Sequence, residues 1–243
     1  MHETPEPDKR DKCVNKIIFC QKTQKMIPNL LKAVLFDFDG TLAALNVDFI
    51  RMRRAVLNLL GDYCAPPDVI ENLYVLEMIE EGSNLISERC PGKEGEFFAR
   101  AHELIGAIET EGAREGTLLP GTEEMLLELR RRHIKTGVVT RNCREAVIQL
   151  FPDIDSRCDA VITREGTARV KPHPDHLLTA LDSLNTDPRF AAMVGDHPMD
   201  ITVGRDVGAY TVGVLTGYSD AGPLRQAGAD LIIERAPDIT RYL

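Results

Sequence analysis

The stretch AVLFDFDGTL, residues 33–42, sets the expectation for the fold. Its first four residues form an apolar run that predicts a short buried strand, Asp37 and Asp39 follow, and a Gly-Thr pair turns the chain. Ionised carboxylates are costly to bury, so we expect both acids to emerge at the carboxyl end of the strand. Ligands bind at that edge of open α/β sheets. We therefore interpret Asp37 as a candidate nucleophile.

The composition bounds the class of protein. With 243 residues, the chain can bury a sizeable core in one large domain or two small ones. Hydrophobic residues make up 43% and charged residues 28%, as is typical of a soluble globular protein. No apolar run approaches the ~20 residues that a membrane-spanning helix needs. The net charge of −9 disfavours nonspecific binding to nucleic acid or anionic lipid. We expect neither nucleic-acid nor membrane partners.

The cysteines and the N-terminus indicate a cytoplasmic protein. The six cysteines are scattered, without the close pairs of a metal site, and stand at Cys13, Cys20, Cys64, Cys90, Cys143 and Cys158. We interpret them as reduced thiols. The first residues also lack the basic start and apolar core of a signal peptide.

Residues 1–32 are predicted to be an N-terminal extension that is poorly structured or peripheral. Residues 1–12 are polar and contain proline, which is typical of disorder. Residues 14–20, VNKIIFC, suit an edge strand or a surface segment, and Met26 offers an alternative start. We expect the extension to be dispensable.

Residues 45–116 are predicted to form an inserted helical segment. Apolar spacing predicts a first helix over about residues 47–60. The Pro-Pro-Asp sequence at 66–68 predicts the start of a second helix, which runs to about residue 81, and residues 97–109 predict a third. Acidic residues outnumber basic ones two to one here, which indicates solvated outer helix faces.

From residue 117 onward, short apolar runs alternate with helical patterns. The predicted strands cover residues 136–140, 160–163, 190–194, 210–214 and 230–233. The predicted helices cover residues 122–133, 142–151, 174–184 and 199–207, with another near Leu224. This alternation favours an α/β fold with a doubly wound parallel sheet. Residues 33–44 and 117–243 would form this core, and residues 45–116 a helical cap inserted into it.

Polar side chains recur at the ends of the predicted strands and in the loops that follow. They are Asp37 and Asp39, Thr140, Lys171 with Pro172, and Gly195-Asp196 with Asp200. Because the carboxyl ends of parallel strands share one edge of a sheet, we expect these groups to converge. Carboxylates suit a hard cation such as Mg²⁺, whereas lysine and a hydroxyl suit phosphoryl oxygens.

These motifs, in this order, resemble the haloacid dehalogenase superfamily. The resemblance rests on DFDGTL, the strand-ending Thr140, Lys171-Pro172 and GDHPMD, and it extends over residues 33–243. The insertion resembles the helical cap of the phosphoglycolate phosphatase-like branch. The segments PGTEEMLLELRRR and AYTVGVLTG also resemble that branch. Each motif alone is more often a simple turn, whereas the ordered set is specific.

The resemblance implies a role for each charged residue. Asp37 would attack phosphorus and form an aspartyl phosphate. Asp39 would protonate the leaving oxygen and then take a proton from the hydrolytic water. The side chains of Asp37 and Asp196, with the backbone carbonyl of Asp39, would bind Mg²⁺. Asp200 would support the metal through its waters or through Lys171, and Lys171 would balance the charge of the nucleophile and the phosphoryl group.

The same resemblance assigns the phosphate contacts. Thr140 and the backbone amides of Gly40 and Thr41 would hold phosphate oxygens. Arg141 and Asn142 follow the threonine and would line the mouth of the site on the substrate side. Arg141-Asn142 departs from the commonest pattern of the branch, as does the AALNVDF that follows DFDGTL. Both departures bear on substrate choice.

Asp39 favours phosphoryl chemistry over carbon–halogen chemistry, because a leaving alcohol needs a proton and a leaving halide does not. We expect a Mg²⁺-dependent phosphatase, monomeric or homodimeric, that hydrolyses a small phosphomonoester such as phosphoglycolate. The alternatives are a phosphosugar mutase or a nucleotidase with the same chemistry, and a non-catalytic binding or regulatory module. The helical cap would close over the substrate and exclude water.

For other polar residues, most of them near the motifs, both a structural and a functional interpretation are open. His173 and His197 suit a metal ligand or a proton relay, but more simply occupy loops. Cys143 lies near a helix start, where a thiolate is stabilised, and we interpret it as packing. Arg51 and Arg54 share a helical face, as a carboxylate clamp or as surface ion pairs.

Overall fold

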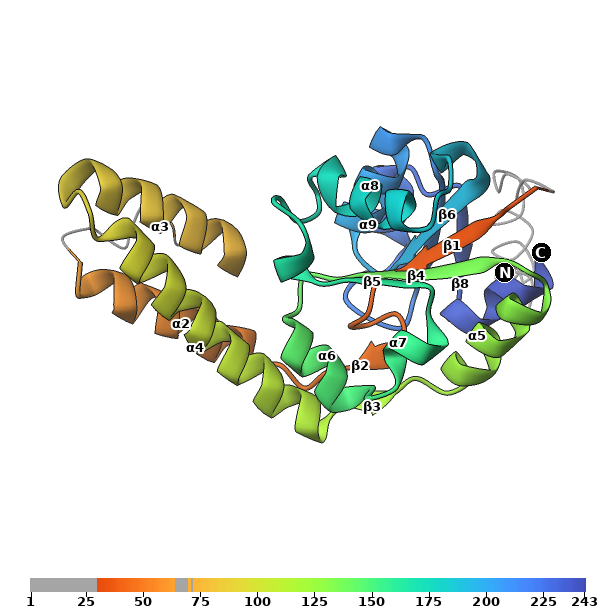
Figure 1. Ribbon diagram of the computed structural model, residues 1–243, viewed down its shortest axis with the longest axis horizontal. Coiled ribbons are helices and arrows are strands. Elements are labelled where there is room, and N and C mark those ends of the chain that lie inside the picture. The colour runs from red at the N-terminus through yellow and green to blue at the C-terminus, as the bar shows by residue number, and fades with distance from the viewer. Residues whose placement is uncertain (1–29, 64–69, 71) are drawn as a thin grey trace, which may run out of the picture.

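The computed structural model describes residues 30–63, 70 and 72–243, and a six-stranded parallel sheet lies at its centre (Figure 1). The strand order is β5-β4-β1-β6-β7-β8. The strands are β1 (Ala33–Phe36), β4 (Lys135–Val139), β5 (Ala160–Ile162), β6 (Ala191–Gly195), β7 (Tyr210–Val214) and β8 (Leu231–Ile233). All four residues of β1 are fully buried, as predicted for a strand between two neighbours. The predicted α/β fold is confirmed.

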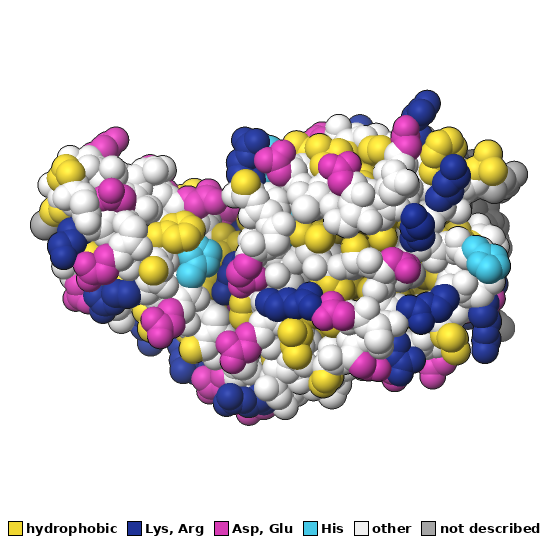
Figure 2. All heavy atoms as spheres, viewed as in Figure 1, with side chains coloured by type: hydrophobic (Ala, Val, Ile, Leu, Met, Phe, Trp, Pro, Cys, Tyr) yellow, Lys and Arg dark blue, Asp and Glu magenta, His cyan; other side chains and the backbone are white. Residues whose placement is uncertain are grey.

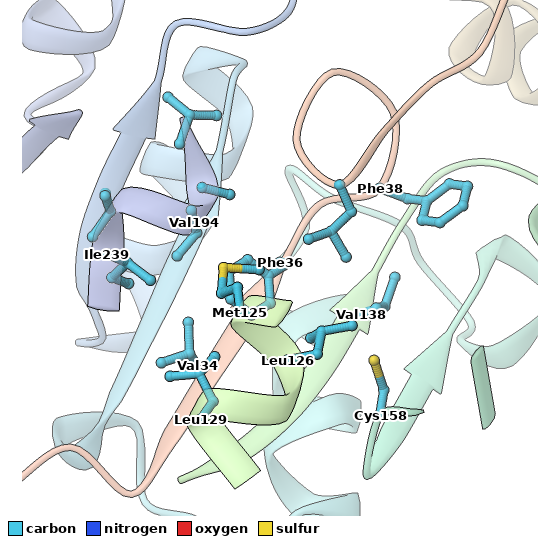
Figure 3. Close-up of a cluster of buried hydrophobic side chains, with 14 of the residues drawn as sticks. Val34, Phe36, Phe38, Met125, Leu126, Leu129, Val138, Cys158, Val194 and Ile239 are labelled. Carbon is cyan, nitrogen blue, oxygen red and sulfur yellow. The ribbon is translucent and has the colours of Figure 1, made fainter. Parts of the chain in front are cut away.

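Alternate residues of β1 face the two layers of helices that cover the sheet. Val34 and Phe36 pack against α5 (Thr122–Arg131), whose residues Met125 and Leu129 lie beside them in Figure 3. Ala33 and Leu35 face the other layer, which contains α8 (Pro174–Ser183) and α9 (Pro198–Val207). Burial on both faces explains why β1 is a continuous apolar run.

Further short elements complete the core. They are α6 (Arg144–Leu150), α7 (Ile154–Arg157), η2 (Arg164–Gly166), η3 (Pro188–Phe190), α10 (Ala221–Ala227) and η4 (Ala236–Arg241). Each predicted strand and helix after residue 121 is present, and the bounds of the long helices differ by two residues or fewer.

The helical insertion contains α2 (Phe49–Gly61), α3 (Val75–Arg89) and α4 (Glu94–Glu115), which form the lobe on the left of Figure 1. These helices share a hydrophobic cluster of their own, separate from the clusters that cover the sheet; it includes Met52, Val56, Leu60, Ile79, Ile86, Phe97 and Ile105. The chain leaves and re-enters the core through β2 (Ala43–Ala44) and β3 (Thr117–Leu118), an antiparallel pair that the sequence analysis missed. Helix α4 packs against α6 near its C-terminal end, where Ala113 lies in one cluster with Ala146.

The predicted end of the second insertion helix at residue 81 is wrong. Helix α3 also begins later than predicted, at Val75, because the described residues 72–74 before it are not helical, and it continues to Arg89, immediately before the Cys-Pro-Gly break at residues 90–92. The polar stretch at residues 81–84 interrupts the apolar pattern, but Gly82 is buried. A Cβ there would lie 3.0 Å from the Phe97 ring of α4, so a residue without one fits best. Small size, rather than polarity, permits this helix contact. The third helix also extends beyond its predicted bounds, over Glu94–Glu115.

Several predictions for the ends and loops of the chain lie outside the described residues. They concern residues 1–29, including the segment 14–20 and Met26, and the Pro-Pro-Asp sequence at 66–68. Among the described helices, none has the length and apolar character required to cross a membrane.

Candidate active site

The carboxyl ends of the sheet strands face the helical insertion (Figure 1), and the predicted acids gather there around one lysine. The Nζ atom of Lys171 lies 2.7 Å from Asp37 Oδ1 and 2.6 Å from Asp200 Oδ1. The Lys171 side chain is only 2% exposed. We call Asp37, Asp196 and Asp200, with Lys171 among them, the acidic rim. Residues that are 163 positions apart in the chain therefore meet, as the strand-end argument predicts.

The three carboxylates of the acidic rim are close enough to hold a metal ion. Asp37, Asp196 and Asp200 each offer an oxygen within 4.8 Å of the others. Burial, and then repulsion from Asp37, raise the pKa of Asp196 to about 6. Three neighbouring carboxylates with only one lysine among them carry excess negative charge on oxygen atoms. Such a group suits a hard divalent cation such as Mg²⁺.

Hydrogen bonds from two other loops orient Asp196. Its Oδ1 accepts from Thr41 Oγ1 at 3.3 Å, and its Oδ2 accepts from the backbone N–H of Tyr218 at 2.5 Å. Gly217 makes the second contact possible, because a Cβ there would lie 2.2 Å from Asp196 Oδ2 and 2.7 Å from the Cα of Gly40. The loop at 216–218 follows β7 and was not singled out for a role, although it lies at the same edge of the sheet.

Asp200 joins the acidic rim to helix α9. It forms a capping box with His197, in which its Oδ2 accepts from the His197 N–H at 3.1 Å. Burial raises the pKa of Asp200, and Lys171 opposes that shift. Burial alone would lower the pKa of Lys171, but Asp200 and Asp37 outweigh it and raise that pKa. The lysine is therefore a permanent cation beside Asp37.

His176 holds the backbone of the lysine loop. Its Nδ1 accepts from the Lys171 N–H at 3.1 Å, and its Nε2 lies 3.2 Å from the Ile162 carbonyl oxygen. This pair of contacts requires a neutral imidazole with its proton on Nε2. Burial, and then the charge of Lys171, lower the pKa of His176 to about 3. The peptide bond between Lys171 and Pro172 is cis.

Asp39 is held apart from the other acids. Its Oδ1 accepts from the backbone N–H of Leu45 at 2.8 Å. Burial raises its pKa to about 7, with further repulsion from Asp37 and Glu109, while the N–H groups of Leu45 and Gly40 oppose the shift. A carboxyl group that titrates near neutral pH can both donate and accept a proton.

The turn after β1 fits closely against the acidic rim. Gly40 has φ +80°, and a Cβ there would lie 2.5 Å from Asp196 Oδ2. Its N–H donates to the Ala43 carbonyl at 2.7 Å, and the Thr41 N–H donates to Phe38 at 3.3 Å. The predicted amide contacts to phosphate therefore compete with bonds inside the turn, and they stay a prediction.

The loop after β4 carries the other predicted phosphate ligands. Thr140 is buried, and its hydroxyl donates to Asn142 Oδ1 at 2.8 Å. The Arg141 guanidinium instead meets Glu77 of α3, with Nη1–Oε1 and Nη2–Oε2 distances of 2.8 and 2.6 Å. Arg141 Nη1 also donates to the Lys171 carbonyl at 3.0 Å. The phosphate contact of Thr140 and the substrate-side positions of Arg141 and Asn142 stay predictions.

A buried ion pair that the sequence analysis missed braces the same loop. Arg164 Nη1 lies 2.7 and 2.6 Å from the two carboxylate oxygens of Glu109 on α4, and both side chains are almost fully buried. Glu109 Oε2 also accepts from the Cys143 N–H at 2.9 Å. We call Glu109 and Arg164, with this N–H, the α4 seam. No local pattern in the sequence pairs these residues.

The structural interpretations of the neighbouring residues agree with the contacts observed. His173 and His197 cap α8 and α9 through their ring nitrogens. Cys143 caps α6 through Sγ, and burial raises the pKa of its thiol to about 11. Arg51 forms an exposed ion pair with Glu111. The described cysteines, Cys90, Cys143 and Cys158, form no disulfide with one another.

A large cavity lies beside the acidic rim rather than on it. It has a volume of about 1060 Å³ and is lined by residues of α3, α4, α6 and η2. Figure 2 shows the corresponding notch between the lobe on the left and the rest of the molecule. Cys143 and Val170 line it, but the three rim acids do not. The converging charges, and not the cavity, locate the candidate site.

Comparisons with known proteins are consistent with this geometry. The family model described as haloacid dehalogenase-like hydrolase matches residues 34–214. An N-acetylmuramic acid 6-phosphate phosphatase from Pseudomonas putida is 30% identical over 222 residues, which cover 88% of this chain and 96% of that protein. A phosphoglycolate phosphatase from Xanthomonas campestris is 28% identical over 221 residues, which cover 86% of this chain and 94% of that protein. A phosphonoacetaldehyde hydrolase-like protein from Oleispira antarctica superposes with a TM-score of 0.66 at 17% identity, covering 91% and 94% of the two chains.

Proposed function

This chain belongs to the haloacid dehalogenase-like hydrolase family, and from that premise we propose that it is a Mg²⁺-dependent phosphatase of a small phosphomonoester. The observation that carries the proposal is the position of the Lys171 Nζ, 2.7 Å from Asp37 and 2.6 Å from Asp200. A permanent cation beside a solvent-accessible carboxylate suits a nucleophile that must approach a dianionic phosphoryl group. The phosphatase names of two relatives support the same reaction class.

In the proposed reaction, a carboxylate oxygen of Asp37 attacks phosphorus and the bond from phosphorus to the ester oxygen breaks. Asp39 gives its proton to the leaving oxygen, so that an alcohol departs. A water molecule then attacks phosphorus, Asp39 takes its proton, and the bond from phosphorus to Asp37 breaks. Inorganic phosphate leaves, and both carboxylates return to their starting states. The intermediate divides one difficult step into two.

The side chains of Asp37 and Asp196, with the backbone carbonyl of Asp39, would hold Mg²⁺. Bound there, the ion would offset the negative charge of the carboxylates and of the phosphoryl oxygens. Asp200 would keep Lys171 in place, as the 2.6 Å contact between them supports. Thr140, with the amides of Gly40 and Thr41, would hold phosphate oxygens after the turn rearranges around the substrate.

The test combines a substrate panel with a nucleophile variant. Purified protein with Mg²⁺ is assayed for phosphate release from a broad set of small phosphate esters. Asp37→Asn should lower kcat by at least about 10³-fold on any ester that the wild type hydrolyses, because the nucleophile is lost. Asp206→Asn, which removes the same charge from an exposed position on α9, should retain activity. Full activity in Asp37→Asn would exclude the nucleophile assignment, and no release from any ester would exclude the function.

A further inference from the structure

Arg141 lies between the loop after β4 and helix α3 of the insertion, and its guanidinium is paired with a carboxylate. Glu77 binds it with two parallel hydrogen bonds of 2.8 and 2.6 Å. This fork is the geometry with which arginine binds carboxylates and phosphates. Arg141 directly follows Thr140, and its Nη1 donates to the carbonyl of Lys171. The fork is therefore fixed to the two loops that border the acidic rim.

The fork is accessible from solvent. The Arg141 side chain is 16% exposed and that of Glu77 is 32% exposed. The Tyr74 ring stacks over the guanidinium at 5.7 Å and is itself half exposed, so a dissolved anion can approach the fork past it. Arg164 in the α4 seam differs, because both partners of that ion pair are nearly fully buried. Of these two ion pairs, only the first is open to solvent.

Exchange at Arg141 would cost little. An incoming anion would replace the fork that Glu77 makes with an equivalent one, and a released Glu77 would remain in the first turn of α3, where a negative charge is favourable. The Lys171 carbonyl and the Tyr74 ring hold the guanidinium after Glu77 leaves. An incoming anion would therefore find a preorganised partner, which lowers the cost of binding.

We propose that Arg141 is the subsite for a second anionic group of the substrate, a carboxylate or a second phosphate, and that Glu77 occupies this subsite in the free protein. The inference rests on the proposed phosphatase function and narrows its substrate class to small esters that carry such a group. A purely structural ion pair between α3 and the core would give the same contacts. The two interpretations differ in how the Glu77 and Arg141 variants select substrates.

Matched ester pairs test the subsite. 2-Phosphoglycolate and ethylene glycol monophosphate have the same chain length and differ in one carboxylate; 3-phosphoglycerate and glycerol 1-phosphate form a second pair. The wild type should have the higher kcat/KM on the acid of each pair. Arg141→Gln should lower this preference about 10- to 100-fold, mainly by raising KM for the acid, because a charged bidentate contact is lost. Glu77→Gln should lower KM for the acids, because the competing carboxylate is gone.

The control variant is Arg144→Gln. Arg144 lies three residues after Arg141 and is itself paired with Asp155, so this variant removes the same charge from a neighbouring ion pair. It should keep the wild-type preference. An unchanged preference in Arg141→Gln would overturn the inference, as would equal losses on acid and neutral esters in Glu77→Gln, the result expected of a structural ion pair. A wild type that prefers the neutral esters would overturn it while leaving the phosphatase function intact. No phosphate release from any ester would instead refute that function, and the subsite with it.

Discussion

The acidic rim and the α4 seam both bury charged side chains, but they bring them together by different means. In the rim, the acids follow strands of one parallel sheet, so the backbone geometry itself places them at a common edge. In the seam, Glu109 on the face of a helix meets Arg164, which is 55 residues away on a 3₁₀ turn. The rim contains more acid than base, whereas the seam is neutral and closed.

This difference separates two tasks. An acidic rim with one lysine attracts a cation and stays open to a ligand. A fully paired, buried seam binds nothing and instead fixes α4 to the loop that carries Thr140 and Arg141, through the Cys143 N–H. The helical insertion is therefore anchored at its C-terminal helix, and closure over a substrate, as predicted from the sequence, would have to bend the chain before Glu109.

The largest effect should come from breaking the seam. Glu109→Gln leaves the guanidinium of Arg164 buried, with only 4% of its side chain exposed, and its remaining acidic partner is the exposed Glu165, 3.6 Å from Nε. We expect a loss of about 3–5 kcal/mol in the free energy of unfolding, the usual cost of removing one partner of a buried pair. Urea denaturation followed by circular dichroism measures this loss.

Two further variants make that prediction specific. Glu111→Gln, on the same helix, breaks an exposed ion pair with Arg51 and should cost less than about 1 kcal/mol. Adding Arg164→Met to Glu109→Gln should recover part of the lost stability, because the buried charge that has lost its Glu109 partner is removed. If Glu109→Gln and Glu111→Gln cost the same, the seam does not anchor the insertion.

The two regions also differ in how far the sequence predicts them. Asp37 and Asp196 of the rim, and Thr140 beside it, each follow a short apolar run, so the alternation of strands and helices is sufficient to place them at one edge. Lys171 and Asp200 lie in the segments after two of these strands, and the ordered motifs point to them. Glu109 has no such signal. It is one of several glutamates on α4, and only the three-dimensional fold shows that this one faces inward. The Arg141–Glu77 contact was unpredictable for the same reason, because its partners are 64 residues apart.

A smaller effect should follow from crowding the rim at Gly217. Gly217→Ala places a methyl group 2.2 Å from Asp196 Oδ2, so the carboxylate or the loop must shift. We expect a loss of about 1–3 kcal/mol in stability, as for other overpacked sites. We also expect a fall in kcat of at least about 10-fold, since small displacements of site groups are costly. Urea denaturation and phosphate release measure the two effects.

The control for that variant is Gly222→Ala at the start of α10, where a Cβ would meet nothing within 4 Å. It should change neither stability nor activity appreciably. Wild-type activity in Gly217→Ala would show that the loop after β7 does not position Asp196, and the hydrogen bond from Tyr218 would then be incidental.

The smallest effect at neutral pH, and the one that connects the rim to pH, concerns His176, whose ring accepts from the Lys171 N–H. Its pKa is lowered from 6.5 to about 3, so the imidazole is neutral in the folded protein and in the unfolded chain above about pH 6.5. As the pH falls below that value, the unfolded chain binds a proton and the folded protein does not. The free energy of unfolding should therefore fall by up to about 1.4 kcal/mol per pH unit on account of this one group, until the pH approaches its folded pKa.

His176→Gln isolates that contribution, because its side-chain oxygen can still accept from the Lys171 N–H while the titrating group is gone. His102, whose pKa is lowered to about 4 chiefly by burial, titrates in both proteins and cancels in the difference. Urea denaturation at several pH values from about 7 to about 4 should give a shallower decline in stability for the variant than for the wild type. Parallel declines would mean that His176 takes up a proton within the folded protein, and the neutral imidazole that supports the lysine loop would have to be abandoned.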